Sequence, residues 1–390
     1  MNIKRTIIVM ENLLLTLSCF GLPPVIKWAG GKERELPYIV ENAPKDFNRY
    51  FEPFVGGGSV FAAMQAKEYL INDKSDELIS LYMAIKNRDQ KAFCAMGIIN
   101  ESWKAMSSFV SEHMAELKSI YCQYRTNKLS DSEAKDSLLV FLDANFKSLE
   151  NNLGEMALDT AQYKKELVRN VIQKFFRMKK IELSRNVMPD CDVEDNVRTA
   201  FMSSLYMYYR HLYNSRNNYS RPELNVALFV FIRNYSYSGM FRYNAKGDFN
   251  VPYGGIGYNN KTLDKKLKYY QSQELVEHFK NTTVECLDFM DFFRKHPPKE
   301  NDFIFLDPPY DSDFSTYAQN AFGKADQERL ATYLVEECKG KWLMIIKNTP
   351  FIYSLYDKPG IKIKAFDKKY QVSFMNRNDR SVEHLIITNY

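Results

Sequence analysis

Residues 303–310 read Phe-Ile-Phe-Leu-Asp-Pro-Pro-Tyr, and this stretch is the strongest indication of both fold and chemistry. Its four apolar residues predict a short buried strand, which places the Asp307 carboxylate at the strand's carboxyl end. Open α/β sheets bind their ligands at that edge. Because prolines fix φ and lack an amide hydrogen, the Pro308 carbonyl can point into a pocket. Two acceptors beside the flat Tyr310 ring suit an exocyclic amino group on a planar base; the alternative is an ordinary strand-end turn.

A second strand-to-helix transition is predicted far upstream, at residues 50–66. An apolar run containing Phe54 leads into the glycines 56–58, and a helix-like stretch follows. Glycines at such a turn let backbone amides approach a ligand, and the helix N-terminus favours negative charge. The next predicted strand ends near Asp73, where a carboxylate can bind two ribose hydroxyls. A glycine triplet is equally an ordinary tight turn, and Phe61 replaces the third glycine of a dinucleotide-binding fingerprint.

Four motifs follow one another along the chain. They are Lys-Trp-Ala-Gly-Gly-Lys at 27–32, Glu-Pro-Phe-Val-Gly-Gly-Gly-Ser at 52–59, a block that begins Arg-Asn-Tyr-Ser-Tyr-Ser-Gly-Met-Phe-Arg-Tyr-Asn at 233–254, and Asp-Pro-Pro-Tyr at 307–310. Together they resemble the Dam-type (α-class) DNA N6-adenine methyltransferases, in which the cofactor motif comes first, the recognition region second and the catalytic motif last. The resemblance implies an α/β fold: a Rossmann-like sheet of the S-adenosylmethionine-dependent methyltransferases, with a helical and β-hairpin DNA-recognition domain.

The activity implied by the resemblance is site-specific methylation of adenine N6 in duplex DNA, with S-adenosylmethionine as methyl donor and the target base flipped out of the stack. Asp307 and the Pro308 carbonyl would accept the two amino hydrogens, and Tyr310 would stack on the base. Contacts to the cofactor are implied for Trp28, Lys32, Phe54, Gly56, Gly58, Asp73, Asp288 and Asp307. For Asp288, the position of a helix N-cap is nearly as good an explanation. No metal is implied.

By the same resemblance, the block at 233–254 is a hairpin that reads DNA. Contacts to DNA are implied for Lys27, Tyr237, Ser238, Met240, Arg242 and Pro252. Lysine and arginine suit guanine, whose O6 and N7 atoms are paired acceptors, so Lys27 and Arg242 favour GATC or a longer site containing GAT. Ser238 replaces an amide that is usual in the family, so a different adenine-containing target stays open.

Other functions fit the sequence less well. A DNA N4-cytosine methyltransferase would share the chemistry, but the adenine-type hairpin argues against it. Methylation of RNA or of a protein glutamine would not need this hairpin, and a nucleotide-dependent oxidoreductase is disfavoured by the absent third glycine. An inactive DNA-binding relative is disfavoured by the intact motif at 307–310.

The 390 residues allow about two to three structural units. Apolar residues at helical spacing predict long amphipathic helices after residue 86, including one through Phe109 and Tyr121 and another over residues 196–210. We expect an N-terminal extension (1–21), the cofactor part of the catalytic domain (22–87), a helical insertion (88–200), a target-recognition region with the hairpin (201–283) and the catalytic part of the same domain (284–390).

The net charge is only +5, but basic residues cluster in two places. Residues 160–185 contain eight Lys or Arg against two Glu, and residues 261–268 contain four Lys against one Asp. Clusters of this kind are typical of phosphate-binding surfaces, and we expect the second, which follows the hairpin, to contact DNA. For the first cluster, a solvated helix face explains the pattern equally well.

The cysteines and the N-terminal residues indicate the cellular compartment in which we expect the protein. The six cysteines form no Cys-x-x-Cys pair, which argues against disulfides and structural zinc. The apolar run before residue 21 is interrupted by Glu11 and is too short to cross a bilayer, and Met10 is an alternative start. We therefore expect a cytoplasmic monomer that acts on double-stranded DNA without a membrane anchor. A cognate restriction endonuclease is a further candidate partner.

Overall fold

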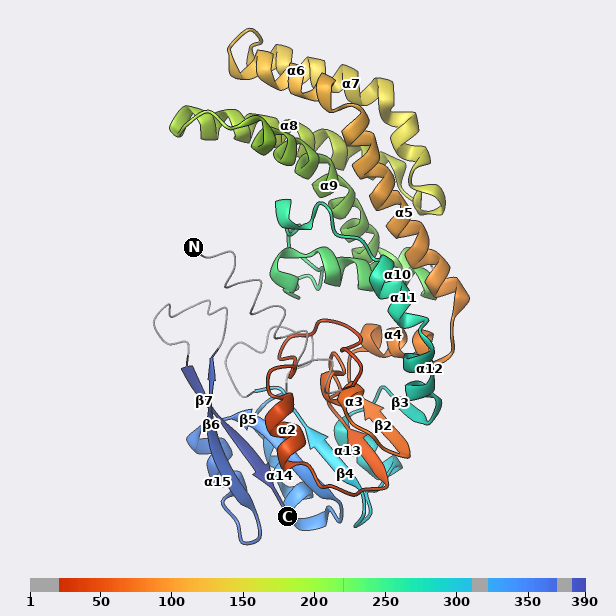
Figure 1. Cartoon of the computed structure of the whole chain (residues 1–390), viewed down its shortest axis with the longest axis vertical. Coiled ribbons are helices and arrows are strands. Elements are labelled where there is room, and N and C mark those ends of the chain that lie inside the picture. Colours follow the sequence, from red (N-terminus) through yellow and green to blue (C-terminus); the bar gives the residue numbers. More distant parts are fainter. Residues whose placement is uncertain (1–20, 220, 311–321, 370–380) are drawn as a thin grey trace. The chain divides into compact units, whose positions relative to one another are not determined.

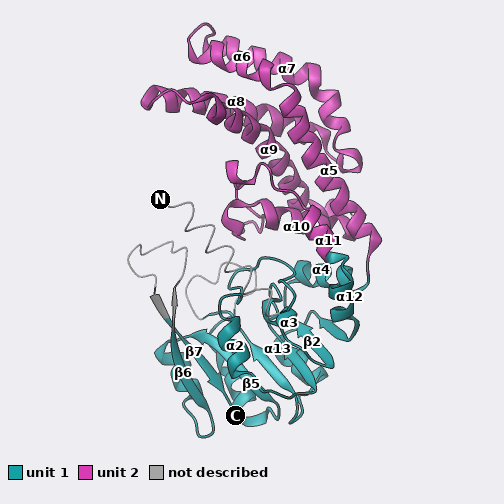
Figure 2. Ribbon diagram, viewed as in Figure 1, with its two compact units in different colours: residues 1–87, 270–390 teal, residues 88–269 magenta. Residues whose placement is uncertain are grey.

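The computed structural model describes residues 21–219, 221–310, 322–369 and 381–390. The chain divides into two compact units, shown in different colours in Figure 2. The first unit contains residues up to 87 and residues 270–390, and the second contains residues 88–269. The second unit is therefore an insertion between two halves of the first.

A mostly parallel sheet forms the centre of the first unit (Figure 1). Within the described residues it has seven strands in the order β3-β2-β1-β4-β5-β7-β6, and only β7 runs antiparallel to its neighbours. The strands are β1 (Arg49–Glu52), β2 (Glu68–Asn72), β3 (Thr282–Glu285), β4 (Phe303–Leu306), β5 (Lys341–Lys347), β6 (Lys362–Lys369) and β7 (Ser381–Thr388). The predicted α/β fold, including the strand at residues 303–306, is confirmed.

Helices cover both faces of this sheet, which explains why β4 is apolar throughout rather than alternating. Side chains of α13 (Phe289–Lys295), α14 (Lys324–Thr332) and α15 (Pro350–Tyr356) pack in one core cluster with β1, β4 and β5. The other helices of this unit are α2 (Leu36–Asn42), α3 (Ser59–Ala63), α4 (Asp76–Lys86) and α12 (Gln273–Lys280). The π-helical turn at Tyr333–Glu337 follows α14.

The strand order reverses between β1 and β4, because β1 is followed outward by β2 and β4 is followed outward by β5. The crevice beyond the carboxyl ends of two such strands is where open α/β sheets bind ligands. β1 leads into glycines 56–58 and β4 leads into Asp307. Pairing of Tyr50 with Phe303 and of Phe51 with Ile304 therefore brings the two distant motifs to one place.

The second unit is helical. Its helices are α5 (Gln90–Glu112), α6 (Met114–Arg125), α7 (Asp131–Asn151), α8 (Thr160–Ser184), α9 (Asp190–Asn214), α10 (Pro222–Tyr235) and α11 (Asp264–Tyr270), which ends at the boundary between the units. The helix expected through Phe109 and Tyr121 is two helices, because the backbone leaves helical geometry at His113 (φ −100°, ψ 9°). The helix predicted over 196–210, with an acidic start from Asp190, is α9, and it has Asp190 and Asp192 in its first turn.

Residues 236–253 form an irregular hairpin in the second unit. Antiparallel bridges pair Ser236 with Tyr253 and Tyr243 with Phe249. At the tip, the Asn244 side-chain oxygen accepts the backbone N–H groups of Lys246 and Asp248, at 2.9 and 3.0 Å. These contacts hold the two arms together without a regular strand.

Residues 270–283 were expected in the recognition region, but the structure places them in the first unit. β3 pairs in parallel with β2, joining Tyr69 to Thr282 and Asn72 to Glu285. The sequence of β3, Thr-Thr-Val-Glu, is short and polar, so its position at the edge of the sheet could not be read from its hydrophobic pattern.

Candidate functional site

The Asp307 carboxylate forms an ion pair with the ammonium group of Lys32 at the end of β4. Only 3% of the Lys32 side chain is exposed, and its ammonium also donates to the Gly30 carbonyl at 2.7 Å. A buried ammonium needs such partners, because removing it from water is otherwise unfavourable. The same nitrogen lies 5.8 Å from the centre of the Tyr310 ring. The structure therefore gathers three predicted site residues at the switch point of the sheet.

A second carboxyl group, that of Glu52 on β1, lies beside this pair and had no role assigned from sequence. It is buried and accepts a hydrogen bond from the Tyr50 hydroxyl at 2.7 Å. Burial raises the pKa of Glu52 well above its ordinary value, and the negative charge of Asp307 raises it further.

The glycine loop after β1 is packed too closely to accept side chains. A Cβ atom on Gly57 would lie 2.3 Å from the Ile26 carbonyl oxygen, and one on Gly56 would lie 2.8 Å from the Trp28 ring. Gly58 has a φ of 73°, in the left-handed region that favours glycine. The Trp28 indole therefore lies directly against the loop, where Gly57 and Gly58 are buried and Gly56 is partly exposed.

Asp73 connects β2 to this loop. One of its carboxylate oxygens accepts the Gly56 N–H and the other accepts the Ser75 N–H, each at 3.0 Å. Burial raises the pKa of Asp73, while these backbone hydrogen bonds lower it. Each oxygen has a second lone pair, so the carboxylate can accept two further hydrogen bonds.

Asn72 is a supporting residue that the sequence analysis missed. Its side-chain amide donates to the carbonyl oxygens of Pro53 at 3.0 Å and Leu287 at 3.1 Å, and its oxygen accepts the Leu287 N–H at 2.9 Å. The loops after β1 and β3 are thereby tied to the end of β2. An amide at a buried strand end was visible in the sequence, but its partner, 215 positions away, was not.

Asp288 and Phe54 are further residues that the sequence assigned to the cofactor. The Asp288 carboxylate accepts an N–H in the first turn of α13 at 3.0 Å, so it caps that helix, and it also accepts from Arg329 at 2.9 Å. The Phe54 ring lies 5.6 Å from both the Phe289 and the Phe322 rings. Together they form an aromatic wall with a carboxylate at its edge, a setting suited to a flat base.

Gln327 is a second supporting residue without a sequence signal. It is fully buried on α14, and its amide nitrogen donates to the Pro309 carbonyl at 2.8 Å. Within the described residues, its amide oxygen has no hydrogen-bond partner. The segment 307–310 is thus held by Lys32 at one end and by Gln327 at the other.

The hairpin alternates between buried and exposed side chains. Phe241, Phe249 and Val251 are buried, whereas Arg242 and Pro252 are exposed. Tyr237 and Ser238 are exposed and Met240 is half-buried in the turn before the first arm, where Ser238 has a left-handed φ of 53°. The Arg242 guanidinium donates to the Asn250 side-chain oxygen at 2.9 Å, which orients it across the hairpin. Lys27 is exposed in the first unit.

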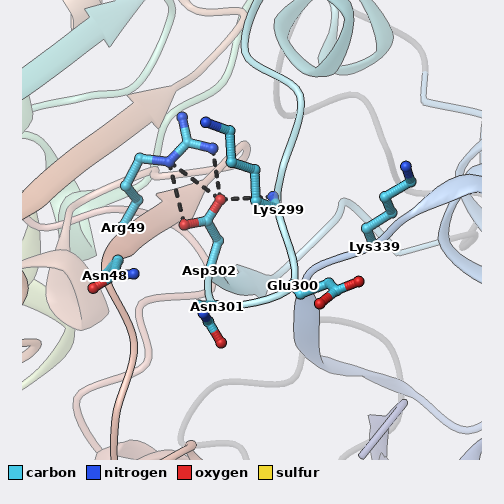
Figure 3. Close-up of a pocket in the computed structure, with 7 residues that line it drawn as sticks. All are labelled: Asn48, Arg49, Lys299, Glu300, Asn301, Asp302 and Lys339. Atoms are coloured by element: carbon cyan, nitrogen blue, oxygen red, sulfur yellow. Dashed lines mark hydrogen bonds and ion pairs between the residues drawn. The ribbon is translucent and has the colours of Figure 1, made fainter.

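A pocket at the opposite edge of the sheet has a structural explanation (Figure 3). It is lined by Asn48, Arg49, Lys299, Glu300, Asn301, Asp302 and Lys339. The Arg49 guanidinium donates to both oxygens of Asp302, with a shortest distance of 2.6 Å. This ion pair joins the residues that start β1 and precede β4, so it supports the pairing that forms the switch point.

Comparisons with known proteins show the family of this chain. The profile of the D12 class N6 adenine-specific DNA methyltransferases matches residues 28–182 and 144–373. The chain is 24% identical to the type II methyltransferase M.CviBI of Paramecium bursaria Chlorella virus NC1A, over 95% of this chain and 100% of that protein. It is 26% identical to the type II methyltransferase M.MjaIII of Methanocaldococcus jannaschii (94% and 99%) and 23% identical to a DNA adenine methylase of Haemophilus influenzae (93% and 92%). Among the helices that the structure describes, none has the length and apolarity needed to cross a bilayer.

Proposed function

This chain belongs to the D12 class of N6 adenine-specific DNA methyltransferases, and we propose which of its residues carry the reaction and which DNA it reads. The match to an adenine class argues against the N4-cytosine alternative. The observation that carries the assignment is the ion pair between Lys32 and Asp307 at the switch point of the sheet. It fixes the Asp307 carboxylate beside the Lys32 ammonium, which also lies 5.8 Å from the centre of the Tyr310 ring.

Asp307, Pro308 and Tyr310 are the catalytic residues in this proposal. The Asp307 carboxylate and the Pro308 carbonyl accept the two hydrogens of the adenine amino group, and Tyr310 stacks on the flipped base. These hydrogen bonds direct the nitrogen lone pair away from the ring plane, towards the methyl donor. Acceptors that are already fixed, together with proximity, supply the larger part of the acceleration.

Methyltransferases of this family use S-adenosylmethionine, whose sulfonium group supplies the methyl. The site fits this cofactor in three respects. The Asp73 oxygens can accept the two ribose hydroxyls, and the wall around Phe54 can hold the adenine ring with Asp288 at its edge. The close packing of the glycine loop, which excludes side chains, suits an approach of its backbone to the ligand. The residues assigned to the cofactor are Trp28, Lys32, Phe54, Gly56, Gly58, Asp73, Asp288 and Asp307.

The activity can be tested by identifying the modified base. The protein is incubated with labelled S-adenosylmethionine and DNA from a host without adenine methylation, and the DNA is then digested to nucleosides. We expect the label in N6-methyladenosine. Label in cytosine would support the N4-cytosine alternative, and the absence of label in any base would support an inactive relative.

We propose GATC, or a longer site containing GAT, as the target. Lys27 and Arg242 read guanines, Tyr237 and Ser238 probe the opened stack, and Met240 and Pro252 pack against a base pair. These roles are supported by exposure: Arg242 and Pro252 are exposed on the hairpin, and Tyr237 and Ser238 are exposed in the preceding turn. Sequencing of methylated adenines in an expressing host tests the target, and modified adenines outside any GAT context would contradict it.

Arg242→Ala is expected to relax discrimination at one base pair by about 1–3 kcal/mol, because a bidentate contact to guanine is lost. The measurement is kcat/KM on duplexes in which each base pair of the site is changed in turn. Lys246→Ala, which removes an exposed charge at the tip of the same hairpin, is the control and should affect all sequences alike. Unchanged discrimination by the Arg242 variant would remove this residue from base recognition.

Gln327→Leu is expected to lower kcat by about ten- to a hundredfold, because the 307–310 segment loses a support and small displacements of reacting groups are costly. The dissociation constant for S-adenosylmethionine should stay near the wild-type value, since the Gln327 amide donates to Pro309, which is not assigned to the cofactor. Glu328→Leu, at the exposed neighbouring position, is the control. A folded Gln327→Leu protein with normal kcat would show that this hydrogen bond does not position the catalytic segment.

For its biological setting, we propose a cytoplasmic monomer that acts in a restriction–modification system or in Dam-like marking of DNA. Relatives named as type II methyltransferases and as DNA adenine methylases support the two settings respectively. Plasmid DNA from an expressing host should resist an endonuclease that cleaves only unmethylated target sites. Sedimentation of the purified protein tests the monomer.

A further inference from the structure

α8 carries a row of basic side chains along one exposed side. Lys165, Arg169 and Arg177 are separated by multiples of four residues and Lys180 follows three residues later, which places all four on the same side of the helix. All four side chains are exposed. The opposite side is buried and consists of Tyr163, Leu167, Val171, Phe175 and Met178. We refer to Lys165, Arg169, Arg177 and Lys180 as the basic row.

The acidic residues of α8 pair with only one member of the basic row, Arg169. Glu166 is buried and accepts hydrogen bonds from the amides of Gln162 and Asn170, each at 3.0 Å. Its contact with Arg169 is longer, at 3.6 Å. Within the described residues, no carboxylate forms an ion pair with Lys165, Arg177 or Lys180. The basic row is therefore a column of like charges suited to a polyanion.

The start of the basic row lies near Arg210, a residue of α9 that contacts the hairpin. Figure 1 shows α8 running alongside α9 within the second unit. Burial lowers the pKa of Arg210 on α9, and the nearby charge of Arg169 lowers it further. Arg210 in turn donates to the Val251 carbonyl of the hairpin at 3.0 Å. Lys180 lies about 16 Å further along α8 than Arg169, so the row leads away from the hairpin.

We propose that the basic row binds the phosphate backbone of duplex DNA beyond the target sequence. This inference rests on the proposed function and adds a second contact with the same substrate. From Lys165 to Lys180 the row spans about 22 Å, which corresponds to about six or seven base pairs. Phosphate contacts carry no sequence information, but they position the protein and offset the free energy of flipping a base.

The chemistry of the row favours DNA over a second copy of this chain. Two copies that met through this face would bring like charges together, which is unfavourable. The exposed apolar side chains near the end of the helix, Leu183 and Val187, lie beyond Lys180 and are not part of the row. A DNA backbone provides one negative charge per 3.4 Å of each strand, so it can engage every member of the row.

The test uses two triple variants. The first carries Lys165→Gln, Arg177→Gln and Lys180→Gln in the basic row. The control carries Lys128→Gln, Lys135→Gln and Lys147→Gln. Arg169 is left in place because it contacts Glu166. The control residues are exposed in the same unit and remove the same charge. Affinity is measured against salt concentration on duplexes of about 12 and about 30 base pairs, each centred on the target mapped in the expressing host.

On the longer duplex, we expect the triple variant to bind more weakly and the slope of log K against log salt to become less steep by about 2–3, one counterion per lost contact. On the shorter duplex it should match the wild type, and the control should match the wild type on both. Turnover at saturating DNA and discrimination between target sequences should be unchanged.

Three outcomes would overturn the inference: an unchanged slope on the longer duplex, an equal loss in the control variant, or an equal loss on both duplexes. A shift in the monomer–dimer equilibrium without a change in slope would also overturn it and would assign the face to a second copy. The wild-type protein separately tests the proposed function. If it methylates the duplex while the slope is unchanged, only the role of the basic row fails; if it forms no N6-methyladenine, the proposed function fails.

Discussion

Asp307→Asn is expected to reduce methyl transfer to about a thousandth of the wild-type rate or less, with S-adenosylmethionine still bound. The asparagine oxygen can accept from Lys32, so the buried ammonium keeps a partner, but the NH₂ group repels the amino hydrogens of adenine. Single-turnover transfer with labelled cofactor measures the rate, and calorimetry measures cofactor affinity. Near-wild-type turnover by this variant would falsify the catalytic role of Asp307.

Asp307→Ala should be equally inactive, but for a reason that includes stability. Among the described residues, it leaves the buried Lys32 ammonium with the Gly30 carbonyl as its remaining hydrogen-bond acceptor. Breaking a buried ion pair costs about 3–5 kcal/mol. We expect a loss of stability near the lower end of this range, because one fifth of the Asp307 side chain is exposed. The double variant Lys32→Met with Asp307→Ala should recover a large part of the lost Tm. If the Tm of the double variant is as low as that of Asp307→Ala, the unpaired Lys32 ammonium is not the cause of the lost stability.

Asp73→Ala is expected to raise the dissociation constant for S-adenosylmethionine by roughly ten- to a hundredfold. A hydrogen bond to a charged acceptor contributes about 1.5–3 kcal/mol, and the Asp73 carboxylate is the proposed acceptor of the ribose hydroxyls. Asp76→Ala, which removes an exposed acid at the start of α4, is the matched control and should leave the affinity unchanged.

Asp73 also holds the Gly56 N–H, so lost affinity alone does not separate a contact with the ribose from a loosened loop. A cofactor analogue without the ribose hydroxyls makes this distinction. The wild type should prefer S-adenosylmethionine to the analogue, and Asp73→Ala should bind both equally. If the variant keeps the wild-type preference, another residue binds the ribose.

Local patterns predicted several elements of the fold. Four consecutive apolar residues predicted β4, and helical spacing of apolar residues predicted the helices of the second unit. These signals depend on which side chains must be buried within one element, so they are readable without tertiary contacts. Where the pattern was continuous but the backbone was not, at His113, the prediction was wrong about the number of helices.

The motifs also determined the family, because strand-end residues carry the chemistry of an α/β site. The amino-acid sequence placed Asp73 and Asp307 at strand ends, and the family profile confirms the enzyme class. It did not contain the neighbours of these residues. Asn72 and Gln327 look like ordinary polar residues until their partners, Leu287 and Pro309, are in place.

Only the tertiary structure decided how the site is assembled. Lys32 and Asp307 are 275 positions apart, with the whole second unit inserted between them. β1 pairs with β4, and the segment before Lys32 is joined to the glycine loop after β1 by the hydrogen bond from Ile26 to Gly57. β3 joined the sheet for the same reason, through pairing with β2. Pairing of parallel strands and burial of an ion pair are long-range interactions whose free energy depends on the partner, whereas the periodicity of a sequence reports only which face of each element is buried.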